Sequence, residues 1–255
     1  MNPIFWKIGN FTIHWYGIMM AFALLSSVLV WHILGKRAGK FPGFGADVGV
    51  WLMVSGLIGA RAAFVVANYD QVYSHAPWEI LMINRGGLIY YGGVAGSCIG
   101  MYIFAVWHHE PKASLADIMI APIPLAHALG RVGCFMNGCC YGRPYDGPFH
   151  AALHGVDVHA VQLYEAALNC LLFVTLLTIY KRRRSAGQVF AIYFMAYGLI
   201  RFFIEFLRGD ERAMLGTITT AQGVSLALLV AGLALFVWTL LKPIPIEVAD
   251  VDTAP

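Results

Sequence analysis

Charged side chains are scarce in this sequence. Of its 255 residues, 12% are Asp, Glu, Lys or Arg and 59% are hydrophobic. A soluble domain usually has about 25% charged residues, which solvate its surface. The deficit excludes an ordinary soluble domain and indicates a polytopic membrane protein. The formal net charge of +3 is too small to indicate a nucleic-acid-binding protein.

Two other signals are missing. The five cysteines are odd in number and follow no regular framework, so they do not indicate a disulfide-stapled fold. The N-terminal stretch MNPIFWKIGNFTIHWYG lacks the basic region and the small-residue cleavage site of a removable signal peptide. We therefore expect the first apolar segment to be retained as a membrane span.

Seven segments are long and apolar enough, or nearly so, to cross a hydrocarbon core, which takes about 20 residues of helix. They cover roughly residues 12–34, 47–68, 88–107, 114–133, 160–180, 188–207 and 220–241. Backbone polar groups in lipid must be satisfied within the segment, so these spans are expected to be helices. The sequence predicts an all-α, seven-span membrane protein with one domain over 1–242, a loop over 134–159 and a disordered cytoplasmic tail over 243–255.

The basic residues predict the orientation, because cytoplasmic loops carry an excess of Lys and Arg. One set of loops contains Lys36, Arg37, Lys40, Lys112, Lys242 and the run KRRR at 181–184. In the opposite loops, fewer basic residues are diluted by acidic ones. The N-terminus is therefore expected outside and the C-terminus inside, with the stretch GCFMNGCCYG at 133–142 on the outer side.

Several ionisable residues fall inside the predicted spans, where a charge is costly and marks a functional candidate. They are Arg61, Arg131, Glu165, Arg201, Glu205 and Arg208, and Tyr197 lies one turn before Arg201 on the same helical face. One interpretation is a structural ion pair between Arg201 and Glu205, because buried charges must be paired. The excess of arginine favours a second interpretation, a phosphate site, because the guanidinium fork suits phosphate. In a membrane this predicts an outward-facing pocket for an anionic lipid.

The stretch GCFMNGCCYG contains three of the five cysteines. Zinc sites usually take cysteines from two separated pairs, and Cys134 followed by adjacent Cys139 and Cys140 does not match that spacing. The C-x-x-C spacing of a redox centre is also absent, although a disulfide from Cys134 remains open in an oxidising periplasm. The third interpretation is that the glycines bend the backbone around a headgroup to which Arg131 and Asn137 donate. We expect no metal and no other cofactor.

Six blocks together resemble the bacterial prolipoprotein diacylglyceryl transferase family. They are HWYG (14–17), GARAAFVVANY (59–69), RGGLIYYGG (85–93), GRVGCFMNGCCYGR (130–143), QLYE (162–165) and YGLIRFFIEFLR (197–208). The resemblance implies an inner-membrane enzyme whose site faces the periplasm. Such an enzyme moves the diacylglyceryl group of phosphatidylglycerol to the lipobox cysteine of a prolipoprotein signal peptide and releases glycerol phosphate. The expected partners are these two substrates and membrane lipid, with no nucleic acid, and the oligomeric state is not predicted.

The resemblance also implies roles for individual residues. Arg131 and Arg201 are expected to hold the lipid phosphate, and Glu205 and Tyr91 complete the expected catalytic set. The residues expected to line the site or to orient the arginines are Tyr16, Arg61, Asn137, Gly142, Glu165, Tyr197 and Arg208. For Tyr16, an aromatic belt at the membrane interface is the alternative interpretation.

Three positions depart from the family's pattern. Tyr91 stands where the third-span motif has a histidine, while Cys134 and Cys139 stand where the signature has an asparagine and a glutamate. A tyrosine, with a pKa of about 10, is a poor base for a thiol, so Glu165 or Glu205 is the expected alternative if a base is needed. Two other functions stay open: a non-catalytic binder or transporter of an anionic lipid or metabolite, and a membrane thiol oxidoreductase built on the cysteines.

Overall fold

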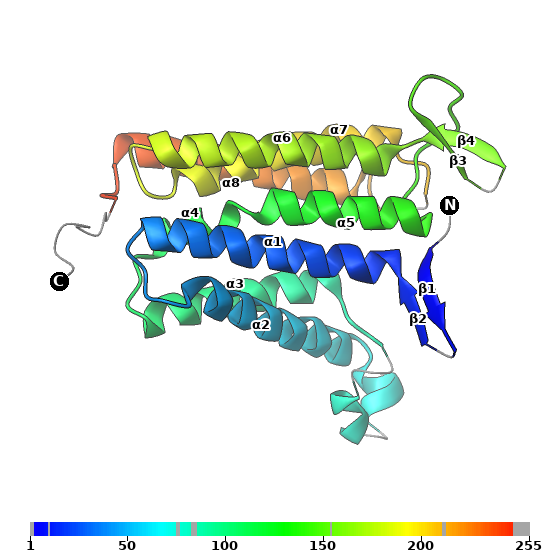
Figure 1. Cartoon of the computed structure of the whole chain (residues 1–255), viewed down its shortest axis with the longest axis horizontal. Coiled ribbons are helices and arrows are strands. Elements are labelled where there is room, and N and C mark those ends of the chain that lie inside the picture. Colours follow the sequence, from blue (N-terminus) through cyan, green and yellow to red (C-terminus); the bar gives the residue numbers. More distant parts are fainter. Residues whose placement is uncertain are drawn as a thin grey trace.

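The computed structural model describes residues 3–9, 11–74, 77–82, 86–153, 155–210 and 213–246. In these residues the chain is a bundle of helices that run roughly along its long axis, with the hairpins β1–β2 and β3–β4 at one end (Figure 1). The helices are α1 (Trp15–Arg37), α2 (Phe44–Ala67), α3 (Tyr90–Trp107), α4 (Lys112–Ile120), α5 (Ile123–Asn137), α6 (Val161–Arg182), α7 (Gln188–Leu207) and α8 (Thr220–Leu241), with the short helices η1 (Tyr69–Tyr73) and η2 (Pro77–Leu81). The strands form three antiparallel pairs: β1 (Ile4–Ile8) with β2 (Phe11–His14), β3 (His150–Leu153) with β4 (Val156–His159), and β5 (Met214–Leu215) with β6 (Ile218–Thr219).

Six helical segments of the described chain are long and apolar enough to cross a membrane. They are α1, α2, the combined α4 and α5 over Lys112–Asn137, α6, α7 and α8. Helix α3, the third span expected from the sequence, has 18 residues and is not among the six, because tyrosines and glycines dilute the hydropathy of its first turns. The prediction of a helical polytopic membrane protein is confirmed with six or seven spans, and the side of the membrane on which each end lies stays a prediction.

The ends of several elements differ from those expected. The first span was expected from residue 12, but residues 11–14 form strand β2 and the helix begins at Trp15. Helix α5 continues to Asn137, and the predicted loop that follows contains the β3–β4 hairpin. At the other end of the chain, Ile244 exchanges hydrogen bonds with the Ser185–Ala186 segment at 2.8 and 3.0 Å. Residues 247–255, the rest of the predicted tail, lie outside the described residues.

Helices α2 and α3 approach each other through glycine. A Cβ atom added at Gly59 would lie 2.6 Å from the Cα of Gly96, and one added at Gly56 would lie 2.7 Å from Oγ of Ser97. Small residues at a helix interface let two backbones come close in lipid, where packing rather than water drives association. The glycines of these two spans therefore serve the packing of α2 on α3.

A buried carboxylate positions the start of α7. Asp117 of α4 is 0% exposed. It accepts hydrogen bonds of 2.9 Å from the backbone N–H groups of Gly187 and Phe190, and Nε of Arg183 lies 3.3 Å from it. The N-terminus of a helix has unpaired N–H groups and a positive dipole end, so a carboxylate there is stabilising. Asp117 thus fixes α7 against α4 at the end of the bundle opposite the hairpins.

Candidate functional site

Glu165 lies at the centre of the predicted site. Its side chain is 1% exposed, and its two oxygens face α5: Oε2 lies 2.9 Å from Nε of Arg131 and Oε1 lies 3.2 Å from Nε2 of His127. His127 and Arg131 are four residues apart on α5, so they share one helical face. The structure therefore brings together Arg131 and Glu165, as the sequence predicts, and adds His127.

The proton on His127 can be assigned from these contacts. Nε of Arg131 lies 3.1 Å from Nε2 of His127 as well as 2.9 Å from Glu165. The direction of the hydrogen bond decides between the tautomers: Nε of Arg131 donates to Nε2 of His127, so Nε2 accepts and the neutral ring has its proton on Nδ1. We assign this tautomer, in which Nε2 is the hydrogen-bond acceptor of the ring and lies 3.2 Å from Oε1 of Glu165.

A second ion pair lies on α7. Nη2 of Arg201 lies 2.8 Å from Oε2 of Glu205, which is 1% exposed, so the pair expected from the i, i+4 spacing is present. Nη1 of Arg201 is buried and has no hydrogen-bond partner in the described part of the chain. An N–H group in that position costs about 1–3 kcal/mol unless a ligand accepts from it. Arg201 therefore has donor capacity left for a ligand.

Aromatic rings join the two ion pairs. The ring centroid of Tyr197 on α7 lies 5.2 Å from that of His127 on α5 and 5.5 Å from that of Tyr193. Tyr90, at the start of α3, lies close enough to Arg131, Arg201 and Glu165 to interact with their charges. The faces of α5, α6 and α7 thus converge on one cluster of charged and phenolic groups.

Tyr91 and Tyr16 are placed differently. Tyr91 is 59% exposed and makes no side-chain hydrogen bond to the described residues, and its ring lies 5.7 Å from that of Tyr90. Tyr16 is 43% exposed and interacts electrostatically with the three cysteines and Arg131. Asn137, the last residue of α5, is exposed. The catalytic role of Tyr91 and the substrate contacts of Tyr16 and Asn137 stay predictions.

Arg61 uses its donors on the backbone. Arg61 is 7% exposed, and its guanidinium donates over 2.6–3.3 Å to five carbonyl oxygens, those of Glu79, Ile80, Met82, Gly86 and Gly87. This geometry supports a positioning role, in which Arg61 holds the segment between α2 and α3. Its predicted contact with the substrate stays a prediction.

The segment after α5 is tied to the end of α7. The backbone N–H of Arg143 donates to the carbonyl of Leu207 at 2.8 Å, and that of Gly209 donates to the carbonyl of Tyr141 at 3.1 Å. Gly142 lies between these bonds, where an added Cβ would be 2.5 Å from that of His159. The glycine at this position therefore permits close packing of the segment on the β3–β4 hairpin.

Arg208 closes the same region and pairs with Asp210. Nε of Arg208 donates to Oδ1 of Asp210 at 2.9 Å, and the second guanidinium nitrogen bonds the other oxygen. Burial works against the charge of Arg208, but the Asp210 carboxylate outweighs it and raises the pKa of Arg208 above its ordinary value. Arg208 is therefore a fixed positive charge with a partner of its own.

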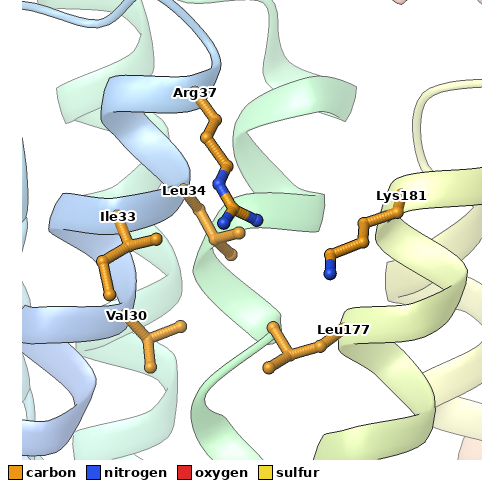
Figure 2. A pocket seen from close by; sticks show the side chains of 6 residues that line it. All are labelled: Val30, Ile33, Leu34, Arg37, Leu177 and Lys181. Atoms are coloured by element: carbon orange, nitrogen blue, oxygen red, sulfur yellow. The ribbon is translucent and has the colours of Figure 1, made fainter.

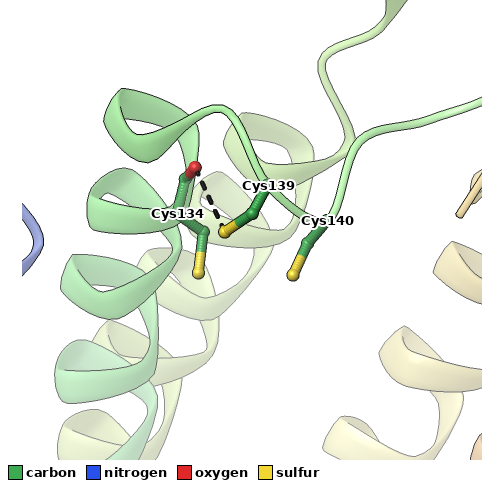
Figure 3. A group of neighbouring side chains, drawn as sticks. All are labelled: Cys134, Cys139 and Cys140. Atoms are coloured by element: carbon green, nitrogen blue, oxygen red, sulfur yellow. Dashed lines mark hydrogen bonds between the residues drawn. The ribbon is translucent and has the colours of Figure 1, made fainter. Parts of the chain in front are cut away.

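The three cysteines of the signature stretch lie together as free thiols (Figure 3). The thiol of Cys139 makes a weak hydrogen bond of 3.7 Å to the carbonyl of Cys134. Hydrogen bonding from the thiol of Cys134 lowers the pKa of Cys140 to about 5, burial opposes this shift, and the charges of Arg208 and Arg131 add to it. Its neighbours therefore favour the thiolate form of Cys140.

A cavity of about 210 Å³ lies elsewhere, between α1 and α6. Figure 2 shows the side chains of Arg37 and Lys181 pointing into it above apolar residues. These residues belong to the last turns of α1 and α6, whereas Tyr16 and Glu165 belong to the first turns. The cavity is therefore remote from the charged cluster, and the predicted site residues do not line it.

His127 is the residue that the sequence analysis missed. It lies one turn before Arg131 in an apolar segment, so the rule that singles out ionisable residues inside spans applies to it as well. The 3.6-residue period places it on the face of Arg131. Its contact with Glu165 comes from another helix, and only the fold shows it.

Comparisons with known proteins show the family of this chain. Residues 3–238 match the family model described as LGT, prolipoprotein diacylglyceryl transferase. Similar proteins include a phosphatidylglycerol–prolipoprotein diacylglyceryl transferase of Finegoldia magna, 33% identical over 236 residues (92% of this chain, 94% of the relative). Proteins of the same description from Symbiobacterium thermophilum and Trichormus variabilis are 33% identical (95% of this chain, 94% of the relative) and 32% identical (100% and 94%). The chain belongs to the prolipoprotein diacylglyceryl transferase family.

Proposed function

We propose that this protein transfers the diacylglyceryl group of phosphatidylglycerol to the thiol of a prolipoprotein's lipobox cysteine and releases glycerol phosphate. The family match and the activity named for its relatives support this reaction. The observation that carries the site assignment is the buried Nη1 of Arg201, which has no hydrogen-bond partner among the described residues and lies in the charged cluster with Arg131 and Glu165. The match over residues 3–238 also supports one catalytic domain that ends near residue 242.

Arg131 and Arg201 have the donors that a phosphodiester needs. Glu165 and Glu205 each engage one edge of their arginine, at 2.9 and 2.8 Å. The terminal nitrogens of Arg131 make no hydrogen bond to the described residues, and one nitrogen of Arg201 is unpartnered. The carboxylates hold each guanidinium in place, and the remaining N–H groups can donate to the phosphate oxygens.

His127 is the best-placed base for the acceptor thiol. Nε2 of His127 accepts from Nε of Arg131 at 3.1 Å and lies 3.2 Å from Oε1 of Glu165, so the ring can take a proton at this nitrogen. An imidazole suits this task near neutral pH, and the carboxylate stabilises the imidazolium that forms. His127 thereby provides the basic group that Tyr91 does not.

The reaction then proceeds by displacement. The acceptor thiol gives its proton to His127, and the thiolate sulfur attacks the glycerol carbon that bears the phosphate ester. The new S–C bond forms as the C–O bond breaks, and the electron pair of the C–O bond stays on the oxygen of the leaving glycerol phosphate. The leaving group gains one negative charge, which Arg131 and Arg201 stabilise more strongly than they stabilise the substrate.

We also propose that the site faces the periplasm of a bacterial inner membrane. The basic residues that predict the cytoplasmic side include Arg37 and Lys181, which lie in the last turns of α1 and α6. The site residues Tyr16 and Glu165 lie in the first turns of the same helices. The charged cluster is therefore at the end opposite the basic one, as an outward-facing site requires.

Transfer of labelled diacylglyceryl from phosphatidylglycerol to a lipobox peptide tests the function. The purified protein should label a cysteine peptide and leave its serine analogue unlabelled. Arg201→Ala should lower the rate about 10²–10³-fold, whereas Arg37→Ala, at the other end of the bundle, should stay close to wild type. Lipid binding without transfer would favour the non-catalytic alternative, and normal transfer by Arg201→Ala would contradict the role given to Arg201.

A further inference from the structure

The fold brings Cys134, Cys139 and Cys140 together although their spacing matches no common metal motif. Their sulfur atoms all lie within 4.8 Å of one another, and Figure 3 shows the three thiols on one side of the turn that follows α5. Left-handed backbone at Gly138 (φ 69°) and Cys140 (φ 60°) turns the chain back, so Cys139 and Cys140 return to the last turn of the helix. Three soft donors thus face a common point.

Cys140 occupies a conformation that disfavours a side chain. The left-handed region costs a residue with a Cβ about 1–2 kcal/mol, and glycine or asparagine would fill it with less strain. Neighbouring hydrogen bonds hold the segment in place. Nε2 of Gln162 donates to the carbonyl oxygen of Cys139 at 2.7 Å, and the N–H of Gly142 donates to the carbonyl oxygen of His159 at 3.1 Å. Strained residues that their surroundings hold in place tend to occur at functional sites.

We propose that Cys134, Cys139 and Cys140 form a binding site for one Zn²⁺ ion. Thiolates are preferred ligands of this ion, and a tetrahedral site with three protein ligands keeps its fourth position open for water or another ligand. Zn–S bonds of about 2.3 Å place tetrahedral sulfur ligands roughly 3.8 Å apart. Sulfurs within 4.8 Å reach that separation by small side-chain rotations. The site goes beyond the proposed function and does not depend on it.

The surroundings suit the charge of such a complex. Three thiolates and one Zn²⁺ ion have a net charge of −1. Arg131 interacts electrostatically with Cys134 and Cys140, and Arg208 interacts with Cys140. These two guanidinium groups stabilise a net negative complex, whereas they would repel a bare cation held by neutral donors. The thiol of Cys139 gives up only its 3.7 Å contact when it binds the ion.

Metal binding by the purified, reduced protein tests the site without any transferase substrate. After dialysis against buffered Zn²⁺, wild type should retain one equivalent by mass spectrometry, and Co²⁺ should give the visible and thiolate charge-transfer bands of a tetrahedral site. Cys134→Ser, Cys139→Ser and Cys140→Ser should each bind at least tenfold more weakly. The control Cys98→Ser/Cys170→Ser, which removes the other two thiols, should bind like wild type. Circular dichroism and thermal melting establish that each variant is folded.

Several results would overturn the site. The first is that the wild-type protein retains no more zinc than a variant with all three cysteines changed to serine. The second is an octahedral Co²⁺ spectrum, and the third is a folded Cys139→Ser protein that binds Zn²⁺ as tightly as wild type. A Cys134 disulfide trapped by rapid alkylation in growing cells would also contradict it, because oxidised sulfurs cannot be ligands. Zinc content is measured separately from transfer. A protein that binds zinc but transfers no lipid would therefore refute the proposed function alone, and the reverse result would refute this site alone.

Discussion

Replacement of His127 tests the proton-transfer step directly. The ring is 20% exposed, and its contacts are the Glu165 carboxylate at 3.2 Å, Nε of Arg131 at 3.1 Å and the Tyr197 ring at 5.2 Å. Glutamine at 127 keeps an amide that can hydrogen-bond with Arg131 and Glu165, and it removes the base. A positioned base contributes about 10²–10⁴-fold to a rate, which corresponds to about 3–5 kcal/mol of the barrier. We expect His127→Gln to lose that much kcat while its KM for phosphatidylglycerol stays within about threefold.

The pH profile separates this role from a structural one. Without His127, the reaction depends on ionisation of the peptide thiol itself, which has a pKa of about 8.5 in water. The rate of His127→Gln should therefore rise about tenfold for each pH unit up to about 8.5 and approach the wild-type rate in alkali. His32→Gln, an exposed histidine on α1, is the control. A His127→Gln enzyme with more than half the wild-type rate at pH 7, or an equally slow one at every pH, would refute the reasoning.

Three further substitutions test positioning and stability. Arg61→Ala leaves up to five carbonyls without their donor and should lower the free energy of unfolding by about 2–4 kcal/mol in thermal or denaturant melts. A stable Arg61→Ala protein with a raised KM for lipid would instead favour the predicted substrate contact. Asp117→Ala should lower the free energy of unfolding by about 3–5 kcal/mol, because it leaves the buried Arg183 without its carboxylate and the first N–H groups of α7 without their acceptor. An unchanged melting temperature would contradict that role. Thr219→Ala removes the capping box of α8 and should cost about 0.5–2 kcal/mol in the same melts, with unaltered activity as its control.

Much of the fold could be predicted from hydropathy, because a segment that crosses the hydrocarbon core must be a helix of about 20 apolar residues. The boundaries are less predictable where the chain leaves the apolar region. Residues 12–14 were expected to be helical but belong to β2, because the pairing that makes them a strand comes from β1. The β3–β4 hairpin was missed for a similar reason, since the composition of 134–159 indicates a loop and only pairing between its two halves makes strands there.

The site was predictable where one helix contains both partners. The i, i+4 spacing gives the Arg201–Glu205 pair from sequence alone. The contacts of Glu165 with Arg131 and His127 join α6 to α5, so their distances follow only from packing. The sequence suggested that the site has more arginines than carboxylates to pair with them, and the structure reduces this excess. Arg208 pairs with Asp210, and Arg61 is satisfied by carbonyls, which leaves Arg131 and Arg201 as the cations with unused donors.

The glycine contact between α2 and α3 has a consequence for how these spans evolve and move. At Gly59 the two backbones themselves set the distance between the helices, since an added methyl would meet Gly96 at 2.6 Å, and elsewhere only small side chains such as Ser97 lie between them. We therefore expect the two helices to move as one rigid unit. Mutational scanning should find its outer, lipid-facing positions permissive and its seam restricted to the smallest residues. Arg61 belongs to α2. The segment between α2 and α3 that it holds should therefore keep its position when lipid-facing residues of these two helices are substituted.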